Sequence, residues 1–118
     1  MLNISYQGKK VSYQFLFPLK TGQNVQLSEL ELRADSTLNG IVRVANLAYN
    51  KTVFIRWTTD NWISCQDTRA NYCYSSEQYT HDSFTFTLDV SLPVRGHDGV
   101  CVELAIGYQV NNALYWDN

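Results

Sequence analysis

Two tryptophans set five positions apart are the first residues whose surroundings suggest a chemical task, in the stretch IRWTTDNWISCQD. Trp57 is in phase with Val53 and Ile55 on one side of an alternating run, and this predicts a ring buried in the core. Trp62 instead follows the polar stretch 58–61, where the alternation has stopped. A ring in a polar loop predicts either a cap folded back over the core or an exposed surface on which a ligand stacks.

The same combination of an aromatic ring with amide or charged neighbours occurs twice more. The two groups are Tyr49 with Asn50 and Lys51, and Tyr115 and Trp116 with Asp117 and Asn118. A pyranose ring packs its face of C–H groups on an aromatic plane, while its hydroxyl groups need donors and acceptors at the rim. The pattern therefore predicts carbohydrate binding without catalysis.

Enzyme chemistry has little support in the sequence. His81 and His97, each followed by an aspartate, supply acid–base side chains, but no Ser or Cys nucleophile has a recognisable setting. No pair of carboxylates can be argued to flank a substrate bond. We expect both histidines to be turn residues, and we expect no cofactor, no metal and no catalytic residue.

Composition and charge narrow the partners. Charged residues make up only 17% of the chain, its formal net charge is -2, and no basic block is present, so we expect no nucleic-acid partner. No apolar run approaches the roughly 18 residues of a membrane span, so we expect no membrane partner either.

The three cysteines, Cys65, Cys73 and Cys101, cannot all pair within one molecule, and their spacing fits neither a zinc site nor a redox motif. Reduced thiols in a cytoplasmic protein are therefore predicted. The alternatives are a Cys65–Cys73 disulfide, or metal ligation together with His81 or His97.

Alternation with a period of two dominates the chain and predicts half-buried strands. The clear runs are 42–45, 53–57, 84–89 and 100–108, the weaker ones 25–33 and 113–116, and the uncertain one 10–17. Clusters of Asn, Asp and Gly predict the intervening turns at LNG, YNK, TTDN, RGHDG and VNNA. The whole predicts an all-β chain, an antiparallel immunoglobulin-like β-sandwich of about eight strands, forming a single domain over residues 1–118.

Four segments of the chain resemble those of a known family. The segments GIVRVANLAYNKTVFIRWTTDNW, DSFTFTLDVSLP, VELAIGYQV and YWDN follow in the order found in starch- and glycogen-binding modules of carbohydrate-binding family 21. The resemblance covers roughly residues 25 to 118, and it is strongest to the version in glycogen-targeting regulatory subunits of protein phosphatase 1. It implies a sandwich that binds α-glucan.

The resemblance also implies which residues bind the sugar. Trp62 matches the loop tryptophan that stacks glucose, and Trp116, within the motif that continues through Asp117 and Asn118, completes that first site. Tyr49 and Lys51 match a second site, whose other aromatic residue falls in the irregular segment ANYCYS, where Tyr72 and Tyr74 are both candidates. A similar module is the starch-binding domain of fungal glucoamylase, which has a further sugar-contacting tyrosine on its penultimate strand. This chain has Ala105 there, which implies a shallower first site.

The implied partners are glycogen, starch and maltooligosaccharides, together with the protein phosphatase 1 catalytic subunit and glycogen synthase, and the implied location is cytoplasmic and glycogen-associated. Two other functions stay open. One is the starch-binding domain of a secreted amylolytic enzyme, and the other is a protein-interaction sandwich that uses the same aromatic residues as interface anchors.

The segment KKVSYQF, residues 9–15, is similar to the phosphatase-docking pattern of basic residues, valine, any residue and then Phe or Trp. Tyr13 stands where the pattern has Phe or Trp. The favoured alternative is an edge strand with Val11, Tyr13 and Phe15 facing inward, and such a strand could dock only by leaving its sheet.

Overall fold

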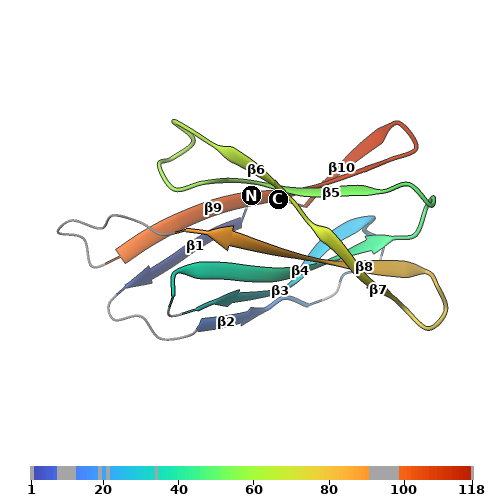
Figure 1. The fold of residues 1–118 in the computed structure, drawn as a ribbon, viewed down its shortest axis with the longest axis horizontal. Helices are drawn as coiled ribbons and strands as arrows, with labels where there is room; N and C mark the ends of the chain where they lie inside the picture. The colour runs from blue at the N-terminus through green and yellow to red at the C-terminus, as the bar shows by residue number, and fades with distance from the viewer. Residues whose placement is uncertain are drawn as a thin grey trace.

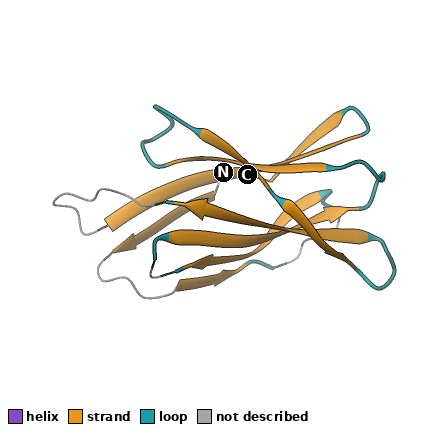
Figure 2. Cartoon of the chain, in the orientation of Figure 1, coloured by secondary structure: helices purple, strands orange, loops and turns teal. Residues whose placement is uncertain are grey.

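The computed structural model describes residues 2–7, 13–18, 20, 22–33, 35–90 and 99–117, and over these ranges it contains strands and no helix (Figures 1 and 2). The strands are β1 (Leu2–Gln7), β2 (Tyr13–Leu16), β3 (Val25–Leu32), β4 (Thr37–Ala45), β5 (Thr52–Thr58), β6 (Gln66–Arg69), β7 (Asn71–Ser75), β8 (His81–Asp89), β9 (Gly99–Val110) and β10 (Ala113–Asp117).

These strands form two antiparallel sheets packed face to face (Figure 1). The first sheet, called sheet A, has the order β1-β9-β5-β6, with β10 also pairing with β9. The second, sheet B, has the order β2-β3-β4-β8-β7. The predicted all-β antiparallel sandwich is therefore confirmed.

The period-two runs predicted β3, β4, β5, β8, β9 and β10, but three further strands were missed. Every residue of β6 and β7 is exposed or half-buried. Both are edge strands, so they lack the buried face that produces alternation. The prediction that ANYCYS is irregular was therefore wrong, because Asn71–Ser75 form β7. The third, β1, pairs with the first half of β9.

Two turn predictions were also wrong. Gly40, in the predicted LNG turn, lies inside β4 and is paired with Leu30 and Phe86. A Cβ atom at Gly40 would lie 2.2 Å from Cζ of Phe86, so this glycine is present because a phenyl ring covers it. His81 begins β8 rather than standing in a turn. The predicted turn VNNA is confirmed, with Asn111 and Asn112 both at positive φ between β9 and β10.

Inward-facing residues of both sheets make one core. β5 contributes Val53, Ile55 and Trp57, which alternate with partly exposed Phe54 and Arg56. Trp57 is 6% exposed, and its indole Nε1 donates a hydrogen bond to Oγ1 of Thr68 at 3.1 Å, so the predicted core position of this ring is confirmed. Among fully buried side chains, Tyr108 on β9 donates its hydroxyl to the Ala45 carbonyl at the end of β4, 2.6 Å away, which links the two sheets.

Replacing Trp57 by alanine should lower the free energy of unfolding by about 3–5 kcal/mol, because a buried ring is replaced by a cavity. Urea denaturation followed by circular dichroism measures the loss. The matched control is Trp116→Ala, which removes the same side chain from a sheet surface and should give a much smaller loss. Similarly small losses at the two positions would show that Trp57 does not support the core.

Candidate functional site

Trp62 lies in the loop of residues 59–65 that joins β5 to β6, which we call the β5–β6 loop. Its ring is half-buried, and the neighbouring Ile63 is 87% exposed. The Ile63 amide donates to the Asp60 carbonyl at 3.2 Å, closing a four-residue turn with Asn61 and Trp62 at its centre. The loop therefore presents Trp62 from a defined turn.

Side-chain hydrogen bonds hold this loop. The Asp60 carboxylate accepts from the Ser64 amide at 3.0 Å, from the Ser64 hydroxyl at 2.6 Å and from the Thr58 hydroxyl at 2.7 Å. The hydrogen bonds from Ser64, and then that from Thr58, lower the pKa of Asp60 to about 2. The carboxylate is thus ionised and engaged at neutral pH.

Trp116 lies on the outer face of sheet A with Phe54, Arg56 and Asp67, and we call this group the Trp116 face. The Trp116 and Phe54 rings meet edge to face, with centroids 5.4 Å apart. The Arg56 guanidinium lies over both rings, 5.3 Å from the Trp116 centroid and 5.6 Å from that of Phe54. Trp116 remains 36% exposed, so the face offers an aromatic surface whose orientation is fixed by packing.

Gly107 makes this packing sterically feasible. Strand register places Gly107 between Phe54 on β5 and Trp116 on β10, and a Cβ atom on Gly107 would lie 2.3 Å from Cζ of Phe54. Beside it, Arg56 donates two hydrogen bonds to the Asp67 carboxylate, at 2.9 and 3.0 Å. These bonds raise the pKa of Arg56 and lower that of Asp67. Ala105 lies opposite Arg56 in the register, so the guanidinium has a small neighbour there.

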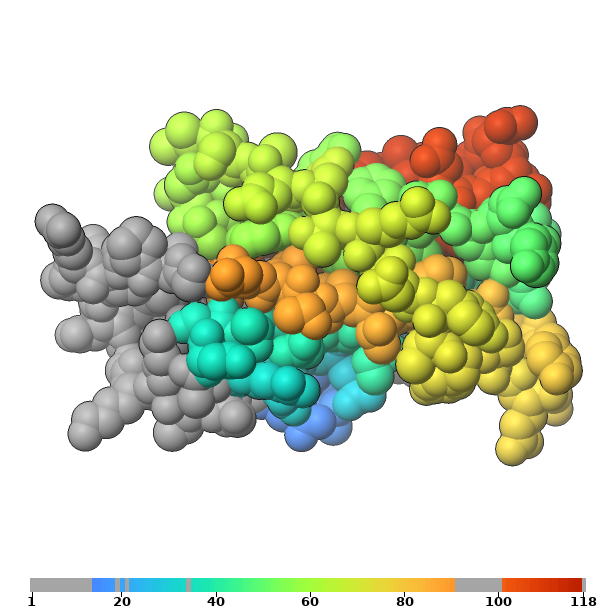
Figure 3. Space-filling model, viewed as in Figure 1, coloured from blue at the N-terminus to red at the C-terminus, as the bar shows by residue number. Residues whose placement is uncertain are grey.

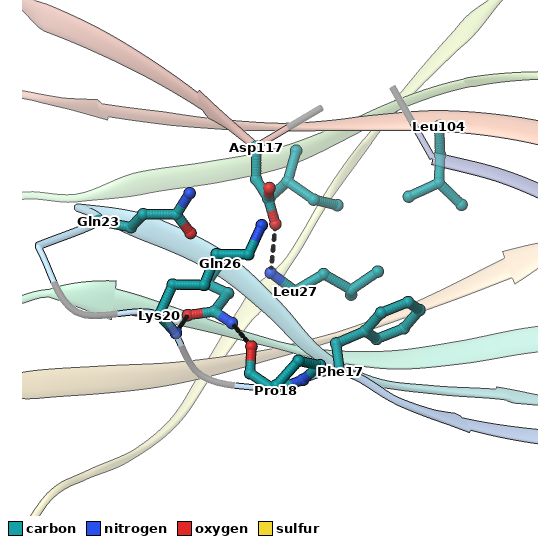
Figure 4. Close-up of a pocket in the computed structure, with 9 residues that line it drawn as sticks. Phe17, Pro18, Lys20, Gln23, Gln26, Leu27, Leu104 and Asp117 are labelled. Carbon is teal, nitrogen blue, oxygen red and sulfur yellow. Dashed lines mark hydrogen bonds between the residues drawn. The ribbon is translucent and has the colours of Figure 1, made fainter.

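Asp117 occupies a different face from Trp116. Its Oδ2 accepts a hydrogen bond from the Leu27 amide of β3 at 2.7 Å, at a cavity of about 260 Å³ beside the sheets (Figure 4). The Gln26 side chain, at the same cavity, accepts from the Lys20 amide at 2.9 Å and donates to the Pro18 carbonyl. This geometry gives Asp117 a contact that links β10 to β3. Its role with sugar stays a prediction, and Asn118 lies outside the described residues.

Tyr49 lies at a second surface, a depression of about 1030 Å³ that we call the Tyr49 depression. Most of its lining comes from the segments 46–51 and 69–72, which lie on one face of the molecule (green and yellow in Figure 3). Tyr49 is 95% exposed, and Tyr72 is 58% exposed. The lining residues are Asn46, Leu47, Ala48, Tyr49, Asn50, Lys51, Arg69, Ala70, Asn71, Tyr72, Ser75, Asp82 and Phe84.

Of the two candidate tyrosines on β7, Tyr72 lines the depression and Tyr74 is not among its lining residues. The Tyr72 ring packs edge to face on Phe84, with centroids 5.9 Å apart, and its hydroxyl lies 2.8 Å from Oγ of Ser75. A shift in register between Tyr72 and Tyr74 interrupts the pairing of β7 with β8. The structure therefore brings Tyr49 together with Tyr72.

Lys51 is placed beneath this surface. Its Nζ lies 2.8 Å from Oδ2 of Asp82, and the two side chains are each 7% exposed. Burial alone would raise the pKa of Asp82, but hydrogen bonds from Lys51 and Ser75 outweigh it and hold that pKa below its usual value. Lys51 is thus committed to a buried ion pair that continues through Ser75 to the Tyr72 hydroxyl.

In the part of the chain that is described, no group of three or more His, Cys, Asp and Glu side chains is placed so that it could hold a metal ion. His81 is partly buried, and burial followed by the nearby Arg43 lowers the pKa of its imidazole. Cys65 and Cys73 carry free thiols, so the alternative disulfide between them is not formed, while Cys101 is exposed on β9. His97 lies outside the described residues. No helix among those described is long and apolar enough to cross a membrane.

Sequence reasoning missed the residues that surround Trp116 and those that hold the β5–β6 loop. Arg56 and Phe54 point outward in register with Trp116, and Thr58, Asp60 and Ser64 bond to one another within the β5–β6 loop. The alternation on β5 indicated that Phe54 and Arg56 face outward. It could not show that they lie beside Trp116, because that depends on the pairing of β5 and β10 with β9.

Comparison with known proteins gives one family match. The model of the carbohydrate/starch-binding module, family 21, matches residues 19–118. Human protein phosphatase 1 regulatory subunit 3B is 38% identical over 84 residues, which are 71% of this chain and 29% of that protein. Glycogen-binding subunit 76A of Drosophila melanogaster is 40% identical over 85 residues, which are 71% of this chain and 12% of that protein. The chain thus spans less than a third of either relative.

A solved structure has the same architecture. The carbohydrate-binding module of the muscle glycogen-targeting subunit of protein phosphatase 1 superimposes with a TM-score of 0.65 at 28% sequence identity. The match covers 81% of this chain and 69% of that module.

Replacing Lys51 by methionine should lower the free energy of unfolding by about 3–5 kcal/mol at neutral pH, because Asp82 would be left buried without its cation. Thermal and urea unfolding measure this loss. Because the pKa of Asp82 is depressed in the folded state, the wild-type advantage should be full above the ordinary carboxyl pKa and shrink as the pH falls below it.

The control for Lys51 is Arg33→Met, which breaks the exposed pair of Arg33 with Glu31, whose side chains are 55% and 41% exposed. This change should cost less than about 1 kcal/mol. Equal small losses for both variants would contradict a structural role for Lys51.

Proposed function

The chain belongs to the carbohydrate/starch-binding module family 21, and from this membership we propose that it binds α-glucan, the polymer of glycogen and starch, without catalysing its hydrolysis. The match of the family model over residues 19–118 carries the proposal, since that range contains both the Trp116 face and the Tyr49 depression. Trp62, Trp116, Tyr49 and Tyr72 are the proposed stacking residues.

The chemistry of the two surfaces supports this ligand. Each presents an aromatic ring to solvent, Trp116 at one surface and Tyr49 with Tyr72 at the other. Asn50, Asn71 and Arg69 surround the second pair and supply donors and acceptors for sugar hydroxyl groups. A single surface that stacks one or two glucose units should bind with a Kd of about millimolar to tens of micromolar. This corresponds to a binding free energy of roughly 4–7 kcal/mol.

The parent protein is proposed to be a glycogen-targeting regulatory subunit of protein phosphatase 1, acting in the cytoplasm on glycogen particles. The chain is 38% identical to protein phosphatase 1 regulatory subunit 3B and 40% identical to glycogen-binding subunit 76A over the matched residues. These identities favour this parent over a secreted amylolytic enzyme. The free thiols of Cys65 and Cys73 fit a reducing compartment. The proposed protein partners are the phosphatase catalytic subunit and glycogen synthase.

The docking segment at residues 9–15 is not needed for this proposal. Tyr13–Leu16 form β2 and pair with β3, as the edge-strand alternative predicted for that part, while residues 8–12 lie outside the described residues. Binding of the phosphatase is therefore best tested with the longer parent.

Co-sedimentation with glycogen and titration with maltoheptaose, followed by tryptophan fluorescence, test the ligand directly. The wild-type chain should bind both, and Trp116→Ala should weaken binding of maltoheptaose by about tenfold or more while the chain stays folded. Tyr79→Ala is the control, because Tyr79 is 72% exposed but lies outside the Tyr49 depression. A wild-type chain that ignores both glucans would favour the protein-interaction function.

Tyr49→Ala should separate the two surfaces. Glycogen presents many chain ends close together, so a second weak surface binds at high effective concentration and raises retention by about 10² or more. We expect Tyr49→Ala to change the Kd for a short maltooligosaccharide little and to lower retention on glycogen clearly. Equal losses on both ligands would mean one continuous site, and no loss on either would remove Tyr49 from the binding surface.

A further inference from the structure

The turn that carries Trp62 has an unusual residue at its second central position. Asn61 and Trp62 have φ values of 57° and 67°, and the Ile63 amide bonds to the Asp60 carbonyl across them. Two positive φ values at the centre of a four-residue turn are the pattern of a type I′ turn. Asparagine is common at the first central position, but glycine is the usual residue at the second.

Trp62 therefore holds a backbone conformation that a bulky side chain rarely adopts. Glycine would occupy this position without steric strain, whereas a side chain with a Cβ atom is disfavoured there. Strained backbone of this kind persists only where the surrounding structure over-determines it. Contacts with the surroundings must therefore fix the position of Trp62.

A cluster of three polar side chains provides such contacts, and we call it the Thr58 clamp: Thr58, Asp60 and Ser64. The Thr58 hydroxyl oxygen accepts from the amides of Asp60 and Trp62, each at 3.2 Å. Its hydrogen has two acceptors, Oδ1 of Asp60 at 2.7 Å and the Ser64 carbonyl at 2.6 Å. Thr58 is 2% exposed, so these contacts are made away from solvent.

The backbone of Thr58 is also held by sheet A, because Thr58 is the last residue of β5 and pairs with Glu103 of β9. Ser64, at the other end of the loop, is tied to Asp60 through both its amide and its hydroxyl. The clamp thus joins the start and the end of the β5–β6 loop, and it contacts the Trp62 backbone through one hydroxyl oxygen.

We infer that Thr58 is a positioning residue for glucan binding: its hydroxyl fixes the backbone of Trp62 so that the indole is held in place before the sugar arrives. This inference rests on the proposed function, because it assigns Trp62 a ligand. Ordering a loop on binding costs free energy, so a ring that is already ordered binds more tightly than the same ring on a mobile loop.

The test replaces the hydroxyl of Thr58 at nearly constant shape. In Thr58→Val the amide of Trp62 loses its acceptor, and the ¹⁵N order parameter of that amide should fall from about 0.85 toward 0.6 or below. The Kd for maltoheptaose should rise about five- to tenfold, while order parameters in β5 and β9 stay unchanged. Thr58→Ser keeps the hydroxyl and should restore both values. Thr59→Val, at the exposed neighbouring position, is the matched control and should change neither.

A second pair of variants tests whether the backbone of Trp62 is held in a strained conformation. Trp62→Gly and Trp62→Ala both remove the ring, but only glycine relieves the positive φ, so the glycine variant should melt a few degrees higher than the alanine variant. Should Thr58→Val keep both the wild-type order parameter and the wild-type Kd, the inference is overturned. If wild-type binds no glucan while Thr58→Val still loosens the Trp62 amide, the proposed function fails and the structural role of the clamp stands.

Discussion

A buried ion pair at one end of the sandwich sets the spacing between the two sheets, and the Tyr49 depression depends on that spacing. Lys51 directly precedes β5 of sheet A, and Asp82 belongs to β8 of sheet B, so their contact at 2.8 Å crosses between the sheets. Two charges removed from water tolerate little separation, because each needs the other to offset its lost hydration. The sheets are therefore held at a defined distance where Tyr49 and Tyr72 emerge.

Alternate residues of the same strand serve the core and the proposed glucan-binding surface. On β5 the inward residues Ile55 and Trp57 fill the core, while the outward residues Phe54 and Arg56 support Trp116. Since neighbouring side chains of a strand point to opposite faces, the two functions occupy alternate positions of one short segment. A shift of one residue in register would exchange them, and so strand pairing fixes the composition of the proposed glucan-binding surface.

The sequence predicted the features that depend on local pattern and missed those that depend on partners. Alternation located the core strands and predicted that Trp57 is buried in the core, because a half-buried strand has an apolar residue at every second position. It missed β6 and β7, which bury no face, and it took Gly40 for a turn residue because the phenyl ring above it comes from β8, distant in sequence. Lys51 and Asp117 were predicted to bind sugar from their neighbours and from the family resemblance, and that role stays a prediction; their contacts with Asp82 and Leu27 come from across the sandwich and were not predicted.

The first and last strands have a topological consequence. β10 and β1 both run antiparallel to β9 along the same edge, with Asp117 opposite Ile106 and Leu2 opposite Leu104. The last strand thus points into the first, and only the row of Ala105 separates them, a gap of about 7 Å at ~3.4 Å per residue. In topological terms the path of the chain from Leu2 to Asp117 nearly closes into a ring. A circular permutant that joined these ends through a short linker, and opened the chain at the Asn111–Asn112 turn instead, would keep every strand pairing of the sandwich.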